Sequence, residues 1–421
     1  MKLTRRAFAT AAAAIPALSA TGVLRAAAPD LAGLRAITGG TAPIGVPERR
    51  ARIARAQALM ILHGVGAVVI EPGSSMVYFT GVEWHRRERL TCAIIPAEGD
   101  PCIVTPYFEE PSVRQTLAIP AEVWAWDEDE DPIARVADWI DRKHLLGKAV
   151  AIEETVRFFV SDGLRSKMED LLPAAKIVSA NPIVRALRMR KTAPEIALMQ
   201  AATDVTIAAY RWTYPRIEKG MKPADIAALM NAATRALGGE PEFALILIGA
   251  AAAYPHGSRD PQIVTDGQIV LMDCGCTVQG YQSDVSRTFV FGSASKEQRQ
   301  VWDHVRTGQA KAFAAAQTGT PAGAVDDAVR TYYESLGYGP RYKLPGLSHR
   351  TGHGIGLDGH EPVNLVHGET TPLAEGMCFS DEPGLYLPGK FGVRLEDCFH
   401  MTASGPQWFS VPPLSLDAPF G

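Results

Sequence analysis

The sequence predicts an α/β (α+β) protein of two domains, in which an alternating α/β domain precedes a larger domain built from two related helix-and-hairpin halves. Three observations support this expectation. Helix and strand patterns alternate between residues 47 and 179, a basic linker follows near residue 182, and the rest of the chain contains an internal repeat. With 421 residues, of which 47% are hydrophobic and 21% charged, the chain is long enough for two cores.

Residues 1–28 have the features of a targeting signal rather than of a folded element. Thr4-Arg5-Arg6-Ala7-Phe8 precedes an uncharged, Ala-rich stretch, which is typical of a twin-arginine signal peptide. Cleavage near Ala26-Ala27-Ala28 is expected, but Pro29 suits signal peptidase poorly, so the cut position and an uncleaved anchor stay open. Later apolar runs are too short to span a bilayer. We expect a periplasmic or secreted protein with no membrane segment after signal removal.

Composition narrows the function class. A formal net charge of −4 and a pI near 6.2 give no basic field of the kind that nucleic-acid binding needs, so a small-molecule or peptide partner is expected. The six cysteines are too scattered for a disulfide framework, and we expect most of them to be buried as small apolar residues. They are Cys92, Cys102, Cys274, Cys276, Cys378 and Cys398.

Residues 47–182 are expected to form the N-terminal domain. An amphipathic pattern predicts a helix over Arg49–Leu62. The segment Ser179-Ala180-Asn181-Pro182 reads as a linker that leads through basic residues into a long helix, whose N-terminal region holds Ala193-Pro194-Glu195. Short apolar runs broken by Gly and Pro predict strands at Gly66–Ile70, Met76–Phe79, Leu90–Ile95 and Cys102–Thr105.

Residues 183–421 are expected to form the second domain, which contains the repeat. In each half a long helix is followed by a Gly break, a short helix and a Leu-Gly pair, and then by strands at residues 268–291 and 377–401. Helices rich in Ala resemble one another by composition, but composition does not predict one ungapped offset of 99 residues. This offset relates Gly220, Ile226, Leu237 and Gly238 to Gly319, Val325, Leu336 and Gly337.

Each half ends in a hairpin with two acidic residues. The midpoint between Asp273 and Asp284 lies in the turn Val278-Gln279-Gly280, so an even-length loop centred there places the two carboxylates directly opposite each other. In the second hairpin the midpoint between Glu382 and Glu396 is Gly389. Like charges in these positions repel unless a cation lies between them. A solvated surface with salt bridges is the alternative interpretation of either hairpin alone.

A histidine and an arginine strengthen the prediction of a metal site. His353 lies in Thr351-Gly352-His353-Gly354-Ile355-Gly356, where glycines allow backbone and metal to approach closely. Arg394, two residues before Glu396, lies on the same face of the strand, where it can orient a ligand or hold substrate. Four carboxylates and one imidazole suit two adjacent divalent ions such as Mn²⁺, Co²⁺ or Zn²⁺.

The ordered set Asp273, Asp284, His353, Glu382 and Glu396, in these contexts, resembles the pita-bread metallopeptidase family, which includes Xaa-Pro aminopeptidase, prolidase and methionine aminopeptidase. The resemblance implies a pita-bread catalytic domain and a creatinase-like N-terminal domain. It also implies that Asp273 binds the first metal, that Asp284 and Glu396 bridge both, and that His353 and Glu382 complete the second. A metal-bridging hydroxide would then attack the scissile carbonyl, with Glu382 transferring its proton.

The same resemblance assigns a substrate shell. His256 and His360 match histidines with catalytic and substrate-binding roles, His349 matches one that forms the proline pocket, and Arg394 is carried over as a contact to ligand or substrate. The implied substrate is a small peptide with proline at the second position, and the implied assembly is a homodimer or a dimer of dimers. Residues 84–87 are candidates to reach a neighbouring subunit's site. Gly359 stands where many relatives have a bulkier residue, so the pocket shape is expected to differ.

Two other function classes remain open at this level. One is a non-peptidase metalloenzyme, a lyase or an amidohydrolase, on the same scaffold. The other is a non-catalytic peptide-binding module. Creatinase-type enzymes and binding modules of this kind typically lack metal ligands, whereas this sequence has all five, which favours an Xaa-Pro aminopeptidase or dipeptidase.

Overall fold

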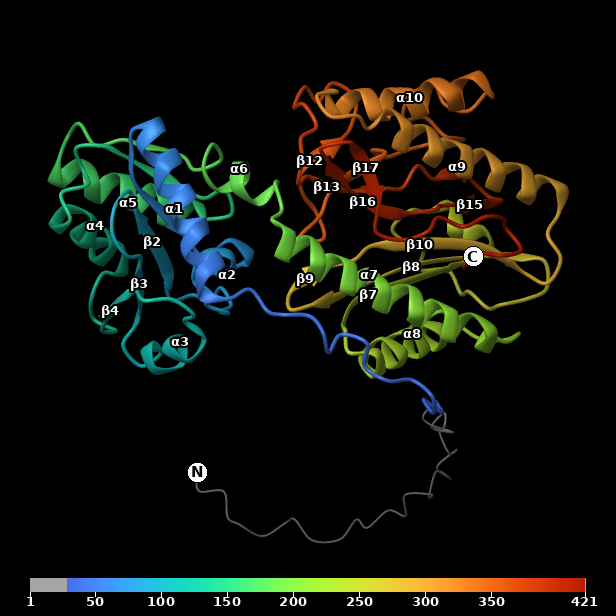
Figure 1. The fold of residues 1–421 in the computed structure, drawn as a ribbon, viewed down its shortest axis with the longest axis horizontal. Helices are drawn as coiled ribbons and strands as arrows, with labels where there is room; N and C mark the ends of the chain where they lie inside the picture. The colour runs from blue at the N-terminus through green and yellow to red at the C-terminus, as the bar shows by residue number, and fades with distance from the viewer. Residues whose placement is uncertain (1–28, 421) are drawn as a thin grey trace, which may run out of the picture.

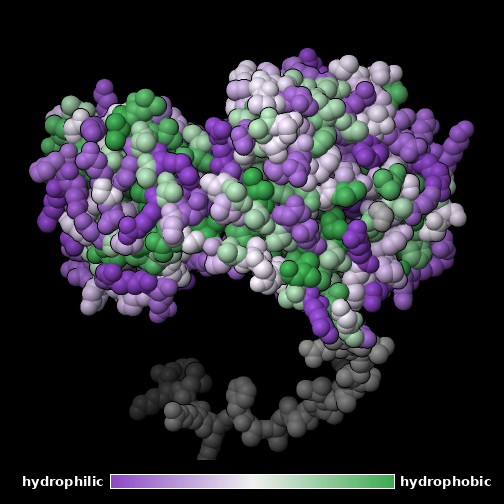
Figure 2. Space-filling view, viewed as in Figure 1, coloured by the Kyte–Doolittle hydropathy of each residue, from purple (hydrophilic) through white to green (hydrophobic). Residues whose placement is uncertain are grey.

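The computed structural model describes residues 29–420, which form two domains and confirm the α/β (α+β) prediction (Figure 1). The predicted signal peptide, residues 1–28, lies outside the described residues. In the space-filling view the domains form two lobes that meet at a waist (Figure 2). Between residues 29 and 420, no helix has both the length and the apolar character needed to cross a membrane.

A six-stranded sheet, with strand order β4-β3-β2-β1-β5-β6, forms the centre of the N-terminal domain. Val68 in β1 belongs to the core beneath α1 and α2, whereas its neighbour Val69 belongs to the core beneath α4 and α5. Helices on both faces explain why the central strands are apolar without alternation. The elements are α1 (Val46–His63), β1 (Val65–Ile70), α2 (Ser74–Thr80), β2 (Cys92–Pro96), β3 (Cys102–Pro106), α3 (Glu110–Thr116), β4 (Glu122–Trp126), α4 (Pro132–Arg142), β5 (Ala149–Ile152), α5 (Phe158–Leu171) and β6 (Ile177–Ser179).

The prediction of a strand over Met76–Phe79 is wrong, because this segment lies in the helix α2. A short apolar run does not distinguish a buried strand from a buried helix. Gly81 ends the helix in the left-handed conformation, with φ of 80°. The helix presents Ser75 to the domain interface, where its hydroxyl accepts a hydrogen bond of 2.9 Å from Arg188.

Residues 29–45 contact the C-terminal domain before the chain enters the N-terminal one. The Ile37 N–H donates to the Leu237 carbonyl over 2.9 Å, and Leu31 and Leu34 pack against the core beneath α7 and α8. In Figure 1 this segment passes from α8 toward α1. The sequence did not predict this contact.

The C-terminal domain packs two helix-and-hairpin halves face to face (Figure 1). Its sheets have the orders β10-β8-β7, with β9 on β8, and β12-β11-β13-β16-β17, and β14 pairs with β15. The elements are α6 (Val184–Arg188), α7 (Ala193–Thr213), η1 (Tyr214–Arg216), α8 (Pro223–Leu237), β7 (Glu240–Ile248), η2 (Gly249–Ala253), β8 (Gln268–Val278), β9 (Tyr281–Gln282), β10 (Val285–Phe291), α9 (Lys296–Ala315), α10 (Ala322–Ser335), β11 (Gly352–Gly354), β12 (Glu361–Leu365), β13 (Cys378–Asp381), β14 (Leu385–Leu387), β15 (Phe391–Val393), β16 (Asp397–Thr402) and β17 (Gly405–Trp408).

The predicted repeat has a structural counterpart in α8 and α10. Gly220 and Gly319, three residues before each helix, have φ of 93° and 84°. The matched residues Ile226 and Val325 are both fully buried. All six cysteines are free and buried, as expected from their scatter.

Candidate metal centre

The first acidic hairpin has a different register from the one that its midpoint predicted. Gln279 and Gly280 have φ of 51° and 81°, which is the two-residue turn that suits the twist of antiparallel strands. The turn is therefore centred one residue later than expected, and Asp273 pairs with Ser286 rather than with Asp284. The predicted pairing of Asp273 with Asp284 is therefore wrong by two positions. A shift of two residues along a strand keeps both carboxylates on one face of the hairpin.

Strand periodicity places the side chain of Asp273 between the two halves of the domain. Ile269 and Leu271 belong to the core shared with the second half, whereas Val270 and Met272 belong to the core beneath α7 and α8. Asp273 continues the first of these two series. Its carboxylate therefore points into the space between the halves.

The second hairpin has the predicted register. Asp381 pairs with Asp397, and Leu385 pairs with Val393, so the two ladders share one register about Gly389. Gly389 has φ of 76° in the connecting loop. Glu382 and Glu396 fall between the ladders on opposing strands, as expected.

Backbone contacts join the two hairpins at Glu396. Ser286 and Glu396 exchange backbone hydrogen bonds of 3.0 and 3.3 Å, and the Ser286 hydroxyl donates to the Glu396 carboxylate over 2.7 Å. Arg287 donates to the Glu396 carbonyl over 2.9 Å and forms a buried ion pair with Asp397 at 2.7 Å. Residues from the two halves are thus held together where the acidic groups meet.

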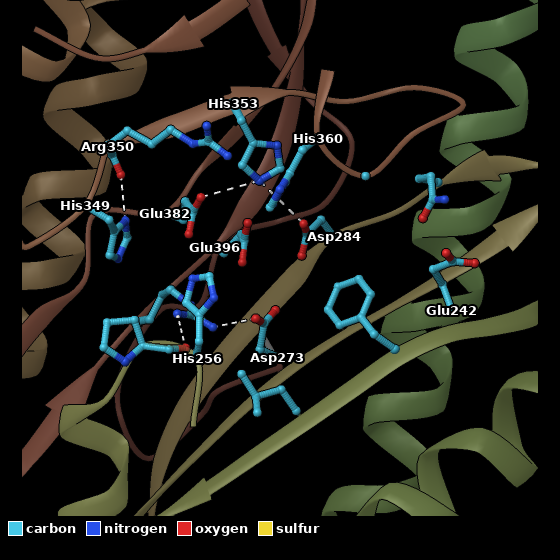
Figure 3. Close-up of a pocket in the computed structure, with 16 residues that line it drawn as sticks. Glu242, His256, Asp273, Asp284, His349, Arg350, His353, His360, Glu382 and Glu396 are labelled. Carbon is cyan, nitrogen blue, oxygen red and sulfur yellow. Dashed lines mark hydrogen bonds and ion pairs between the residues drawn. The ribbon is translucent and has the colours of Figure 1, made fainter. Parts of the chain in front are cut away.

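His353 lies in β11, where two glycines permit close packing. A Cβ at Gly352 would lie 2.0 Å from the Ser380 carbonyl oxygen, which no side chain tolerates. His353 Nδ1 lies 3.0 Å from the Gly354 carbonyl, which can only accept, so Nδ1 carries the proton. The lone pair of Nε2 then faces Asp284 at 3.7 Å and Glu382 at 3.4 Å (Figure 3).

All five predicted ligands come together in the structure. Asp273, Asp284 and Glu396 form one group whose ligand atoms lie within 4.8 Å of one another, and His353, Glu382 and Glu396 form a second group that shares Glu396. A third group of the same size contains Asp284, His353 and the exposed His360.

The electrostatics of these groups fit divalent cations. Oδ1 of Asp273 and Oδ1 of Asp284 are buried and have no hydrogen-bond partner within the described residues. Burial, followed by the charge of Asp273, raises the pKa of Asp284 well above its usual range, and burial followed by Asp284 does the same for Glu396. Burial also raises the pKa of Glu382 to about 7. Because buried carboxylates without counter-charge are costly, this donor set suits bound metal ions.

Arg394 orients the acidic cluster. Its guanidinium contacts the Asp273 carboxylate, and its Nε donates to the Ser286 hydroxyl over 2.9 Å. Another nitrogen lies 3.3 Å from the Tyr386 hydroxyl. These contacts place Arg394 where it can orient the Asp273 carboxylate.

The predicted substrate-shell histidines lie around the same cavity of about 690 Å³. His349 bonds through Nε2 to the Tyr386 hydroxyl and through Nδ1 to the Arg350 carbonyl, each at 2.7 Å, and burial lowers its pKa to about 3, so it forms a neutral wall. His256 is exposed at the rim. The His360 ring lies 4.1 Å from the His353 ring, and burial lowers the pKa of His360.

The domain interface fixes the loop that ends in His360. Glu361 accepts backbone hydrogen bonds from Leu357 at 3.0 Å and Asp358 at 3.1 Å. Burial raises its pKa, but Lys191 and Arg188 outweigh this effect and lower the pKa to about 2. The buried Glu361 carboxylate thus ties the linker between the domains to the site.

Spacing arguments did not identify several residues that line the cavity. Arg350 stands between His349 and His353, and this position is the sequence signal that marks it. Glu242, Phe243 and Gln282 come from β7 and β9, and nothing in their local sequence marks them. Their role depends on how the halves meet.

Comparisons with known proteins found relatives of both domains. Residues 197–403 match Metallopeptidase family M24, and residues 52–190 match the Creatinase/Prolidase N-terminal domain. The chain is 32% identical to the probable dipeptidase PepE of Mycobacterium tuberculosis, over 84% of this chain and 92% of that protein. It is 30% identical to the Xaa-Pro dipeptidase of Lactobacillus helveticus, over 79% of this chain and 89% of that one.

A solved structure extends the similarity to the whole fold. The dipeptidase PepE from Mycobacterium ulcerans superposes with a TM-score of 0.79 at 30% identity, over 89% of this chain and 98% of that chain. The similarity thus covers both domains. The chain belongs to metallopeptidase family M24 and carries the N-terminal domain of the creatinase and prolidase type.

Proposed function

We propose that this protein is a dinuclear metal-dependent peptidase that hydrolyses Xaa-Pro dipeptides. The observation that carries the proposal is the pair of ligand groups that share Glu396 inside one cavity of substrate size. The name of the Lactobacillus helveticus relative, Xaa-Pro dipeptidase, supports the same reaction. All five candidate metal ligands are present, which argues against a non-catalytic peptide-binding module.

Asp273, Asp284 and Glu396 would hold one ion, and His353, Glu382 and Glu396 the other, with Asp284 near enough to serve both. Oxygen donors with one imidazole favour Mn²⁺, with Co²⁺ or Zn²⁺ as alternatives. When bound, two such ions lower the pKa of a water molecule and stabilise negative charge on the scissile carbonyl. Glu382, with its pKa raised to about 7 by burial, is suited to take up a proton and release it to the proline nitrogen.

Arg350 supports dipeptides over longer peptides. Its guanidinium lines the cavity and forms no ion pair with any residue from 29 to 420. In Figure 3 Arg350 and His349 lie on one side of the acidic cluster. A proline ring beside the neutral His349 would bring its free carboxylate toward Arg350, where a charge-assisted hydrogen bond can form.

The proposal is tested with purified, Mn²⁺-loaded protein on Ala-Pro, Ala-Pro-Ala and Ala-Ala. We expect release of alanine from Ala-Pro, much slower release from the tripeptide, and none from Ala-Ala. Equal rates on Ala-Pro and Ala-Pro-Ala would indicate an aminopeptidase instead. Inactivity on all three would refute the peptidase proposal and favour a metal-dependent lyase or amidohydrolase.

His360→Ala separates a substrate role from a ligand role. Because His360 lies within reach of Asp284 and His353 but is exposed, we expect kcat to fall about 100-fold while two metal ions per chain remain. Elemental analysis of the dialysed variant measures the metal content. A drop to one ion would assign His360 to the ligand set.

We also propose export through the twin-arginine pathway, supported by Arg5-Arg6 and the apolar stretch after them. Replacement of both by lysine is expected to retain the protein in the cytoplasm, which cell fractionation measures. The homodimer, or dimer of dimers, implied by the family resemblance stays a prediction, and light scattering of the purified protein checks it.

A further inference from the structure

The end of the cavity opposite Arg350 is acidic. In Figure 3 Glu242 lies across the ligand cluster from Arg350 and His349. If the carboxylate of an Xaa-Pro dipeptide binds Arg350 and its carbonyl lies at the cluster, the side chain of Xaa extends toward Glu242. This step rests on the proposed function.

Glu242 has no counter-charge of its own. It is exposed to the cavity from β7 and forms no ion pair within residues 29–420. Two residues earlier on the same strand, Glu240 lies outside the cavity and pairs with Arg235 at 3.6 Å. The strand thus presents one compensated and one uncompensated carboxylate.

A second hydrogen-bond acceptor lines the cavity from β9, which pairs with the same part of β8 as the start of β7. Gln282 is only 6% exposed, and its Oε1 has no hydrogen-bond partner among the described residues. Buried amide oxygens are nearly always paired, so this one is suited to a donor supplied by a ligand. The Glu242 carboxylate and the Gln282 amide oxygen together favour a ligand group with several hydrogen-bond donors.

The same end has room for a long side chain. A Cβ built at Gly359 would meet only Gln282 Oε1, at 3.9 Å, so this wall is open. Phe243 supplies an apolar surface, and its ring is seated over Gly275, where a Cβ would lie 2.4 Å from the ring. A methylene stem can lie along Phe243 while its charged head remains hydrated near Glu242.

We propose that the enzyme prefers Xaa-Pro dipeptides whose first residue is Lys or Arg, and that Glu242 determines this preference. Glu242 faces the cation of the side chain, Phe243 contacts the stem, and Gly359 leaves the space that both need. Glu242 is a specificity residue and takes no part in bond cleavage.

The test compares Lys-Pro with norleucyl-Pro, which has the same stem and α-amine but lacks the terminal ammonium group. For the wild type we expect kcat/KM to be about tenfold higher for Lys-Pro, as one charge-assisted contact contributes. Glu242→Gln should bring the two values together by lowering only the Lys-Pro value. Glu240→Gln, the matched control on the same strand, should leave the wild-type ratio unchanged.

Each outcome is decisive. Equal kcat/KM values for both dipeptides in the wild type would overturn the preference while leaving the peptidase function intact. An equal loss on both substrates in Glu242→Gln would assign Glu242 to the α-amine and overturn its role in specificity. Absence of cleavage of every dipeptide would be a failure of the proposed function, which the Ala-Pro assay detects separately.

Discussion

Asp284→Ala is expected to abolish turnover, with a loss of kcat of about 1,000-fold or more. Asp284 belongs to the group with Asp273 and Glu396, and it also faces His353 Nε2 at 3.7 Å, so it lies between the two ligand groups together with the shared Glu396. Its removal would take a ligand from each of the two proposed ions. Steady-state kinetics on Ala-Pro and metal content by elemental analysis check this result, and near-normal rates would refute the two-metal assignment.

The same variant should not destabilise the metal-free protein. Burial and the charge of Asp273 raise the pKa of Asp284, which means that its ionised form opposes folding. Without metal, Asp284→Ala is therefore expected to be at least as stable as the wild type in thermal unfolding. A lower midpoint would show that Asp284 is a structural residue.

Asp326→Asn provides the matched control. Asp326 is also fully buried in the C-terminal domain, but it pairs with Arg330 at 2.6 Å and accepts hydrogen bonds from Thr351 at 2.7 and 3.1 Å. Loss of this charge should cost about 3 kcal/mol of stability and leave the metal content unchanged. Opposite results for the two aspartates would separate the ligand role from the structural one.

The two hairpins show what spacing can and cannot predict. The loop about Gly389 is symmetric, so the midpoint of Glu382 and Glu396 fixes the register directly. In the first hairpin the turn is set by Gln279 and Gly280, a pair without the strong Asn-Gly signal, and the midpoint is one residue off. Asp273 and Asp284 still lie on one face of the hairpin, because strand faces repeat every two residues.

The residues that line the cavity could not be predicted from the sequence, for a different reason. Arg350 and Glu242 come from different halves of the domain, and their positions at opposite ends of one cavity depend on how β7 packs against the segment before β11. No local periodicity encodes that distance. The helix over Met76–Phe79 was missed because its seven-residue span is too short for its periodicity to be recognised.

Metal removal is expected to destabilise the protein strongly at pH 8 and only slightly near pH 5.5. In the metal-free protein the pKa of Glu382 is raised to about 7, and those of Asp284 and Glu396 are raised well above their usual range. At a pH between the unfolded-state and the folded-state pKa of each group, the folded state therefore holds more protons than the unfolded state. By linkage, the stability that protonated Glu382 contributes is fully present below its unfolded pKa and is lost as pH rises through about 7.

The loaded protein should show the opposite trend, because cations bind the deprotonated carboxylates and compete with protons. With free Mn²⁺ at about 1,000 times Kd, binding adds about 4 kcal/mol, which corresponds to a shift of about 10 °C in Tm. The gap in Tm between Mn²⁺-loaded and chelated protein is thus expected to widen from pH 5.5 to pH 8, as measured by differential scanning fluorimetry. Glu382→Gln, which removes the group with pKa near 7, should flatten the profile of the chelated protein around pH 7. A gap that stays constant with pH would mean that the cations are not held by these carboxylates.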